Sequence, residues 1–267
     1  MCAARERRSP PSRHHGSAHT IGEMSTVLFI YAHPDDESFG SAGTAMKFRA
    51  AGHTTALLTL TRGDAGLWAG KQAGTWSPAE LAAERSKEWR NAVAVIGFSQ
   101  TRLLEWPDGG LATSPLERVT ADVVQFVRDT RPDVICTFGP EGAGSEHDDH
   151  RAASFFAVRG FHRAALTDQY PERGLPHAAQ RLFFNATPLM PEWPIVAMSP
   201  THAVDIEAFR ERKAAAFECH RTQLKDSERF RRIQELLNGR EYFHLAIDRS
   251  GAQPLGADIL AGPDGTR

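Results

Sequence analysis

The sequence predicts an α/β fold, a Rossmann-like three-layer α/β/α domain with a mainly parallel sheet. From Thr26 onward, short apolar runs alternate with helical patterns, which is typical of βαβ units. The runs are largely apolar along their whole length, as expected for parallel strands that are buried on both faces. In such a fold, ligands bind beyond the carboxyl ends of the strands, so polar residues at those ends are candidates for a site.

The expected strands follow from these apolar runs. Residues 27–32, 55–61 and 133–138 give the clearest runs, and three further candidates are shorter. In chain order, strands are expected at residues 27–32, 55–61, 102–106, 133–138, 181–185 and 195–198.

Two helix starts are explicit in the sequence. Ser-Pro-x-Glu begins at Ser77 and again at Ser114, which supplies an N-cap serine, a proline at the first helical position and a glutamate for a capping box. The helix from Ser77 carries an apolar stripe and ends at Gly97. Further helices are expected after the first strand as far as Gly52, from about His150, at residues 206–223 and at residues 227–237.

Length and composition indicate one large domain. The chain has 267 residues, of which 41% are hydrophobic and 24% charged, and this length suits a single α/β core. We expect the domain to span residues 24–248. Residues 1–23 are basic and rich in Pro, Ser and His without an apolar h-region, so they are predicted to be a disordered tail, with Met24 a candidate start. Residues 249–267 are predicted to be a loosely ordered tail.

The net charge and the cysteine content limit the classes of partner and the location that we expect. A net charge of -2 and a pI near 6.6 give no electrostatic reason to expect nucleic acid or an anionic membrane as partner. No stretch approaches the roughly 20 apolar residues of a membrane span. The three cysteines, Cys2, Cys136 and Cys219, are widely spaced, which fits no disulfide framework and favours a cytoplasmic location. The expected partner is a small molecule, and homo-oligomer formation stays open.

Two polar clusters follow strands and carry the chemistry. Residues 33–37 read His-Pro-Asp-Asp-Glu directly after the first strand, and residues 147–150 read His-Asp-Asp-His after a Gly-rich loop that follows the 133–138 strand. Imidazoles and carboxylates delivered to one edge of a sheet are typical of a metal site.

A catalytic zinc ion takes three protein ligands and keeps one position open for water. His33 and Asp36, three residues apart across a turn, can converge on one ion, and His150 can supply the third ligand. The metal lowers the pKa of its bound water to roughly 7. One ion is expected, and imidazole and carboxylate ligands suit ferrous iron as well as zinc.

Three neighbouring residues are candidates for proton transfer and charge stabilisation. Asp35 lies beside a predicted ligand and can accept the proton of the water as general base. His147 can stabilise the developing oxyanion or pass a proton to the leaving amine. Asp149 is expected to orient His147 through the other ring nitrogen.

These motifs resemble those of the LmbE-like (PIG-L) family of zinc-dependent N-deacetylases, over residues 27–223. The two histidine clusters carry most of the resemblance, and weaker similarities follow in the family's order. These are at residues 61–66, 85–88, 96–97, 107–109 and 205–206, and at Lys213, His220 and Gln223.

The resemblance implies a deacetylase that removes an acyl group, expected to be acetyl, from the amide nitrogen of an amino-sugar conjugate. It implies zinc on His33, Asp36 and His150, and residues similar to Arg85 and Asp108 that contact the sugar or its aglycone.

The sequence departs from the family pattern at three positions. Asp148 replaces a common proline, Ser145 stands where some members have a mobile tyrosine, and Gly40 stands where thiol-conjugate amidases have lysine. Gly40 favours deacetylation over conjugate cleavage, and with Ser145 neither a tyrosine acid nor a tyrosine oxyanion donor is expected.

Alternatives remain open from the residues alone, which indicate only metal-assisted hydrolysis. The chain could be an amidase of a thiol conjugate or another non-sugar amide. It could also be a phosphoesterase, if Asp148 and Asp149 bridged a second ion. A ligand-binding protein without activity is disfavoured because it would not need Asp35. A nucleotide-binding oxidoreductase is disfavoured because no Gly-x-Gly-x-x-Gly follows the first strand.

Overall fold

Seven strands form one sheet in the part of the chain that the computed structural model describes, residues 24–66, 76–190, 195–249 and 259–260. The order across the sheet is β3-β2-β1-β4-β5-β7-β6. All pairs among β1 to β5 are parallel, and β7 pairs antiparallel with both β5 and β6. The predicted α/β class with a mainly parallel sheet is therefore confirmed. The strands are β1 Thr26–Tyr31, β2 Thr54–Thr61, β3 Gln100–Trp106, β4 Val134–Thr137, β5 Arg181–Ala186, β6 His202–Asp205 and β7 Arg240–Asp248.

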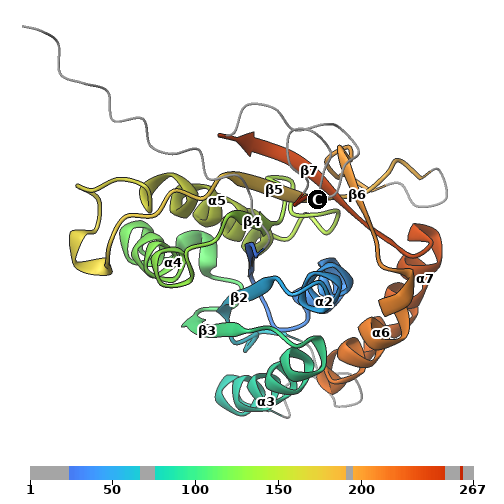
Figure 1. Cartoon of the computed structure of the whole chain (residues 1–267). Coiled ribbons are helices and arrows are strands. Elements are labelled where there is room, and N and C mark those ends of the chain that lie inside the picture. The colour runs from blue at the N-terminus through green and yellow to red at the C-terminus, as the bar shows by residue number, and fades with distance from the viewer. Residues whose placement is uncertain (1–23, 67–75, 191–194, 250–258, 261–267) are drawn as a thin grey trace, which may run out of the picture.

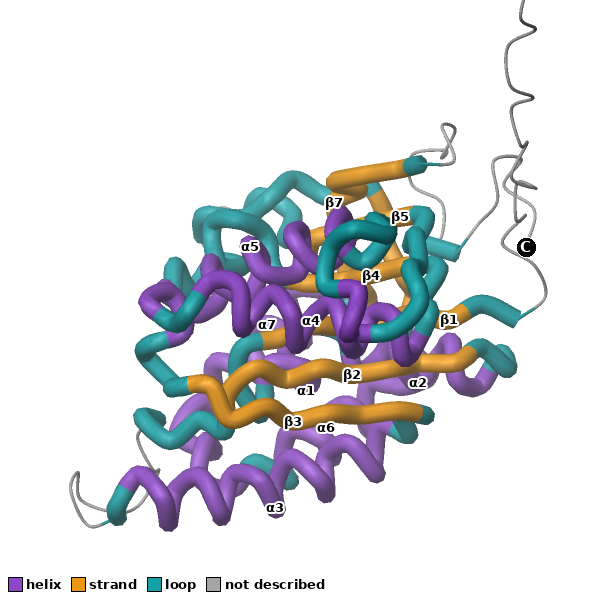
Figure 2. Tube along the Cα trace, turned by 90° about the vertical axis from the view of Figure 1, so that its left-hand side faces the viewer, coloured by secondary structure: helices purple, strands orange, loops and turns teal. Residues whose placement is uncertain are grey.

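Helices cover both faces of the sheet and make the outer two layers. Figure 1 shows α4 and α5 on one face, and α2, α3, α6 and α7 on the other. Figure 2, turned by 90°, shows the long α3 below the edge that β3 forms. The helices are α1 Asp36–Gly40, α2 Ala42–Ala50, α3 Pro78–Ile96, α4 Leu116–Thr130, α5 Asp148–Arg163, α6 Arg210–Glu218 and α7 Ser227–Leu237.

The two serine signals for helix starts have different outcomes. Ser77 forms the predicted capping box with Glu80, and α3 ends at Gly97 in a left-handed conformation. Ser114 does not cap α4, because its hydroxyl donates to the carbonyl of Gly110 at 3.0 Å and Pro115 stands between it and the helix. The start of α4 is still within two residues of the expected position.

The C-terminal third departs most from the expected elements. Residues 195–198, which the structure describes, form no strand; the edge of the sheet is instead built by β6 and β7. These two strands are partly exposed and antiparallel, so they lack the continuous apolar run that marks a buried parallel strand. The helix expected at residues 206–223 is broken into a 3-10 turn, α6 and a second 3-10 segment at Arg221–Asp226. The break lies at His220, whose backbone is not helical (φ -83°, ψ 63°).

The predicted domain boundaries at residues 24 and 248 stay predictions. The expected N-terminal tail lies outside the described residues, and so does the expected C-terminal tail apart from Arg249, Ile259 and Leu260. No described helix is both long enough and apolar enough to cross a membrane. Cys136 is buried and unpaired, and Cys219 is half-buried and unpaired.

The topology places the site. From β1 the chain proceeds outward through β2 to β3, and then returns to the other side of β1 to add β4 and β5. The connections therefore diverge at β1 and β4, and a crevice opens at their carboxyl ends, where ligands bind in folds of this kind. Both polar clusters of the sequence follow these two strands.

Candidate metal centre and active site

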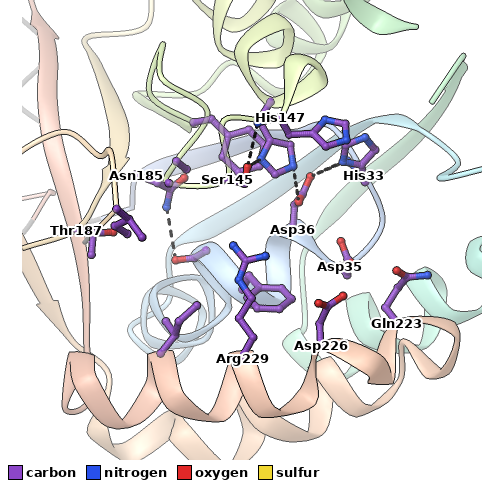
Figure 3. A pocket seen from close by; sticks show the side chains of 18 of the residues that line it. His33, Asp35, Asp36, Ser145, His147, Asn185, Thr187, Gln223, Asp226 and Arg229 are labelled. Carbon is purple, nitrogen blue, oxygen red and sulfur yellow. Dashed lines mark hydrogen bonds and ion pairs between the residues drawn. The ribbon is translucent and has the colours of Figure 1, made fainter. Parts of the chain in front are cut away.

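Two loops that follow neighbouring parallel strands carry the polar residues of the site. His33 lies just after β1, and Asp36 is the first residue of α1. His147 is the N-cap of α5, and His150 lies in the first turn of that helix. Because β1 and β4 are adjacent and parallel, both loops leave the same edge of the sheet. Figure 3 shows His33, Asp36 and His147 together at one end of a cavity.

The three residues predicted to bind the metal lie together. The ligand atoms of His33, Asp36 and His150 are all within 4.8 Å of one another. Nδ1 of His33 is 3.5 Å from Oδ2 of Asp36, and Nε2 of His150 is 3.2 Å from Oδ1 of Asp36. Burial alone would raise the pKa of Asp36, but the imidazoles of His150 and His33 hold that pKa well below its usual range. Two imidazoles and a charged carboxylate are a donor set that fits zinc or ferrous iron.

A second group of ligand atoms overlaps the first. His33, His147 and Asp149 also have ligand atoms within 4.8 Å of one another. In this group both oxygens of Asp149 are already engaged, because they accept backbone N–H groups from the loop at residues 109–111, at 2.6 and 3.0 Å. Nδ1 of His147 likewise accepts the backbone N–H of Asp149 at 3.2 Å. In the first group, Oδ2 of Asp36 also accepts a backbone N–H, from His33 at 2.7 Å, but Oδ1 accepts none from the described residues and faces His150. The first group is therefore the better metal site.

The outer nitrogen of His33 faces two carboxylates. Nε2 of His33 is 3.0 Å from Oδ1 of Asp108 and 3.2 Å from Oδ2 of Asp149, which is fully buried. Burial lowers the pKa of His33, but the two carboxylates outweigh burial and raise it well above its usual value. A proton on Nε2 leaves the lone pair of Nδ1 directed at Asp36, which is how carboxylates orient histidine ligands of metals.

The side chain and the backbone of Asp149 contact different histidines. The sequence predicts that Asp149 orients His147, whereas the structure places its carboxylate 3.2 Å from Nε2 of His33. His147 is held by the backbone N–H of Asp149, because the imidazole accepts that hydrogen bond as the N-cap of α5. A side chain in the first turn of a helix points back along the helix, so the carboxylate passes its own N-cap residue and reaches the loop beyond.

His147 is an exposed imidazole at the rim of the metal cluster. Burial lowers its pKa, and the nearby rings of His33 and His150 lower it further. Because Nδ1 accepts a hydrogen bond, the neutral ring carries its proton on Nε2. The side chain is therefore a neutral hydrogen-bond donor.

Ser145 makes a contact with a predicted metal ligand that the sequence did not suggest. Its hydroxyl lies 2.9 Å from Nδ1 of His150 and donates to the carbonyl of Gly142 at 2.8 Å. The hydroxyl oxygen can therefore accept the Nδ1 proton of His150, which leaves Nε2 free to face Asp36. The ring of His150 also stacks on Phe138, with centroids 4.1 Å apart. Ser145 thus supports a predicted metal ligand.

Asp35 lies beside the cluster and outside the ligand set. Its carboxylate is 3.4 Å from a guanidinium nitrogen of Arg85 and lines the cavity. Burial raises the pKa of Asp35 to about 6, against the opposing charge of Arg85. A carboxylate with that pKa is ionised at neutral pH and is still a useful proton acceptor.

Arg85 is largely engaged by the protein itself. Its side chain is almost fully buried, and it donates to the carbonyl of Gly63 at 2.9 Å and to the carbonyl of Pro34 at 2.5 Å. A Cβ added at Gly63 would lie 2.3 Å from Arg85, and one at Gly66 would lie 2.5 Å away. The glycines of residues 61–66 therefore make room for the guanidinium. The predicted substrate contacts of Arg85 and Asp108 stay predictions, although both residues line the cavity.

The cavity extends well beyond the metal cluster. Its volume is about 400 Å³, and the cluster occupies one end. Figure 3 shows Gln223, Asp226 and Arg229 on the opposite wall, which α7 and the preceding 3-10 segment form. Among the described residues, neither Asp226 nor Arg229 has a hydrogen-bond or ion-pair partner. The sequence gives no signal for Asp226 and Arg229, because a polar residue on an expected helix looks like any solvated side chain.

The structure also shows where the other two residues that depart from the family pattern lie. Asp148 is exposed and pairs with Arg151 at 3.1 Å, so it points to solvent and away from the cluster. Gly40 lines the cavity, where an added Cβ would lie 3.2 Å from the hydroxyl of Tyr31.

A protein-family model described as PIG-L: GlcNAc-PI de-N-acetylase matches residues 28–161. The chain is 28% identical to 1D-myo-inositol 2-acetamido-2-deoxy-alpha-D-glucopyranoside deacetylase 2 of Catenulispora acidiphila, and the match covers 90% of this chain and 98% of that protein.

Solved structures share the fold. The N,N'-diacetylchitobiose deacetylase from Pyrococcus horikoshii, in complex with its inhibitor MPG, matches with a TM-score of 0.68 over 83% of each chain, at 23% identity. GalB, the 4-carboxy-2-hydroxymuconate hydratase of Pseudomonas putida KT2440, matches with a TM-score of 0.66 over 85% of this chain and 98% of that chain, at 17% identity. One fold therefore serves different reactions, and the reaction has to be argued from the site.

Proposed function

The chain belongs to the PIG-L family, and from this premise we propose that it is a metal-dependent N-deacetylase of an amino-sugar conjugate. The observation that carries the proposal is the cluster of His33, Asp36 and His150, with Asp35 beside it, at one end of a cavity. The acyl group is acetyl in this proposal, and the amide nitrogen belongs to a glucosamine unit.

We assign one metal ion to His33, Asp36 and His150, with zinc as the first candidate and ferrous iron as the second. When bound there, the ion would polarise the amide carbonyl and lower the pKa of the attacking water. Asp108 and Asp149 support the assignment, because their carboxylates orient His33 through its outer nitrogen.

Two residues of the chain transfer the protons and stabilise the developing charge. Asp35, ionised at neutral pH, accepts a proton from the attacking water and then delivers it to the leaving amine nitrogen. His147 donates from Nε2 to the carbonyl oxygen as negative charge develops on that oxygen. A neutral His147 suits this part better than that of a general acid, because its Nδ1 is held as an acceptor.

The rest of the conjugate would lie against the wall that faces the metal. The amide must reach the cluster, so the aglycone extends toward Asp226 and Arg229. Arg229 offers a cation without an acidic partner among the described residues, which favours an aglycone that carries a negatively charged group. In this proposal, the aglycone is recognised at a distance from the amide that reacts.

Two alternative functions are less well supported. An amidase of a thiol conjugate or another non-sugar amide would use the same cluster and differ only at the opposite wall. A two-metal phosphoesterase is less well supported, because Asp148 points to solvent and both oxygens of Asp149 accept backbone N–H groups. We further propose that residues 24–248 form the catalytic domain and that the protein works on small molecules in the cytoplasm.

The proposal is tested by measuring metal content together with amine release. The purified chain is loaded with zinc or ferrous iron and offered N-acetylglucosamine conjugates with neutral and with anionic aglycones. We expect one equivalent of metal and release of acetate that stops when a chelator removes the ion. No bound metal after reconstitution would overturn the assignment, and one equivalent of metal without amine release would overturn the substrate class.

A further inference from the structure

Asp35 has a backbone conformation that a residue with a side chain rarely adopts. Its φ is 108° and its ψ is -26°, in the left-handed region that favours glycine. Such a conformation persists only where the surrounding structure holds it in place. The groups that hold Asp35 are therefore of interest, because they fix the direction of the proposed general base.

Glu37 holds the backbone of Asp35 directly. The backbone N–H of Asp35 donates to Oε2 of Glu37 at 3.1 Å. The other oxygen of Glu37 accepts from Nε2 of His220 at 2.7 Å and from the hydroxyl of Ser38 at 2.8 Å. Both Glu37 and His220 are fully buried. The side chain of Glu37 is therefore fixed between the turn that it supports and an imidazole from a distant part of the chain.

His220 reaches Glu37 because the helix expected at residues 206–223 is interrupted. Helix α6 ends at Glu218, and the non-helical backbone of His220 turns its ring inward. The 3-10 segment that follows starts from the carbonyl of His220, which accepts the N–H of Gln223 at 2.8 Å. The break in the helix and the contact with Glu37 are thus one feature of the structure.

We propose that Glu37 and His220 are positioning residues for Asp35. Glu37 holds the backbone of the strained residue, and His220 holds Glu37, so that the Asp35 carboxylate faces the cavity beside the metal ligands. The inference rests on the proposed function in one respect, which is that Asp35 acts as a base. Neither residue lines the cavity, so each acts through Asp35.

The contact between His220 and Glu37 also joins α6 to α1, so a purely structural role has to be tested separately. The chain offers a matched control for that role. Lys213, on the same helix α6, forms a second buried ion pair with Glu241 at 2.6 Å. Glu241 also accepts the backbone N–H groups of Gly43 and Thr44, at 3.0 and 2.7 Å, and so supports the start of α2. This pair is as buried as the first one. Lys213 also donates to the carbonyl of Phe39 at the far end of α1, at 3.0 Å, but neither residue of the pair contacts Asp35.

The experiment compares His220→Leu, His220→Gln and Lys213→Met in the full chain loaded with metal. His220→Leu removes the donor to Glu37, and His220→Gln keeps an amide donor at a similar distance. We expect His220→Leu to lower kcat by about 100-fold, the cost of a small misplacement of a reacting group, with KM and metal content unchanged. His220→Gln should recover most of kcat, and Lys213→Met should lower the melting temperature but leave kcat within about twofold of the parent chain.

A second readout does not depend on activity. Amide hydrogen exchange at Asp35 reports whether its N–H is still bonded to Glu37. We expect slow exchange in the parent chain and in Lys213→Met, and fast exchange in His220→Leu. Equal losses of kcat in His220→Leu and Lys213→Met, or an Asp35 amide that stays protected in His220→Leu, would overturn the proposal.

The two hypotheses fail in distinguishable ways. If the parent chain binds metal but hydrolyses no amide, the proposed function fails, and the exchange rates still decide whether His220 holds the turn. If the parent chain is active and His220→Leu keeps its kcat, the proposed function stands and the positioning role is wrong.

Discussion

The two ends of the cavity are built on different principles. At the metal end, the polar side chains are mostly buried and each has a protein partner, as with His33 between two carboxylates and His150 beside Ser145. On the opposite wall, Asp226 and Arg229 are accessible, and the described residues offer them no hydrogen-bond or ion-pair partner, although the guanidinium of Arg229 lies over the ring of Phe39. The rigid end suits a reaction that requires fixed geometry, whereas unpaired charges on a helix surface suit recognition of a variable group. Substitutions at the two ends should therefore have different kinetic signatures.

The largest effect is expected at Asp35. Asp35→Asn should lower kcat by about 10² to 10⁴-fold with metal content unchanged, because an amide cannot accept the proton of the attacking water. Asp36→Asn is the neighbouring control, and it should lose metal and activity together because it removes a charged ligand. Metal analysis and initial rates on the same preparations separate the two cases. An Asp35→Asn variant with near-normal turnover would exclude the general-base role.

A smaller effect is expected at Asp149, where the structure and the sequence analysis give different predictions. Asp149→Asn should weaken metal affinity by roughly 10 to 100-fold, because it removes a carboxylate that orients His33. If Asp149 instead served His147, kcat would fall and metal affinity would not change. Asp148→Asn is the matched control, since that side chain points to solvent and pairs with Arg151. Competition against a metal chelator of known affinity measures the difference.

The contrast between Asp149 and Asp35 shows what the sequence could and could not predict. The spacing of His33 and Asp36 across a turn, and the position of both clusters after strands, were enough to predict that His33, Asp36 and His150 lie together with Asp35 beside them. The partner of Asp149 was not predictable, because its carboxylate meets a ring that is 116 residues away in the chain. Spacing within a motif predicts contacts inside that motif. A contact between two motifs, such as that of Asp149 with His33, depends on how the two loops pack against each other.

The same limit explains the errors at the C-terminal end of the fold. Continuous apolar runs identified the parallel strands, but β6 and β7 form a partly exposed antiparallel edge without such runs. The break at His220 was also hidden, because the ring turns inward to meet Glu37 rather than in response to a local breaker such as proline. The wall that contains Arg229 depends on both features, so its position could not be derived from the sequence.

A still smaller effect is expected on that wall. Arg229→Ala should raise KM by on the order of tenfold for a conjugate with an anionic aglycone, and should leave kcat unchanged, because it removes a charged hydrogen-bond donor remote from the amide. With a neutral aglycone, KM should change little. Arg231→Ala is the control on the same helix, since Arg231 pairs with Glu235 at 3.2 Å away from the cavity. A parallel rise in KM for both aglycones would mean that Arg229 does not contact the charged group.

The smallest effect is on stability and concerns the support of the metal end. Burial lowers the pKa of His220, but the charge of Glu37 outweighs burial and raises this pKa above its ordinary value of 6.5. Because the pKa is higher in the folded state, the stabilisation is complete below the unfolded value and is lost as the pH rises through the folded value. The free energy of unfolding of the metal-free chain should therefore fall with rising pH more steeply than that of His220→Gln, which has no titrating group there. Urea unfolding across this range measures both slopes. Parallel slopes would mean that the buried pair contributes no pH-dependent stability, and that His220 supports the turn at Asp35 as a neutral donor rather than as a cation.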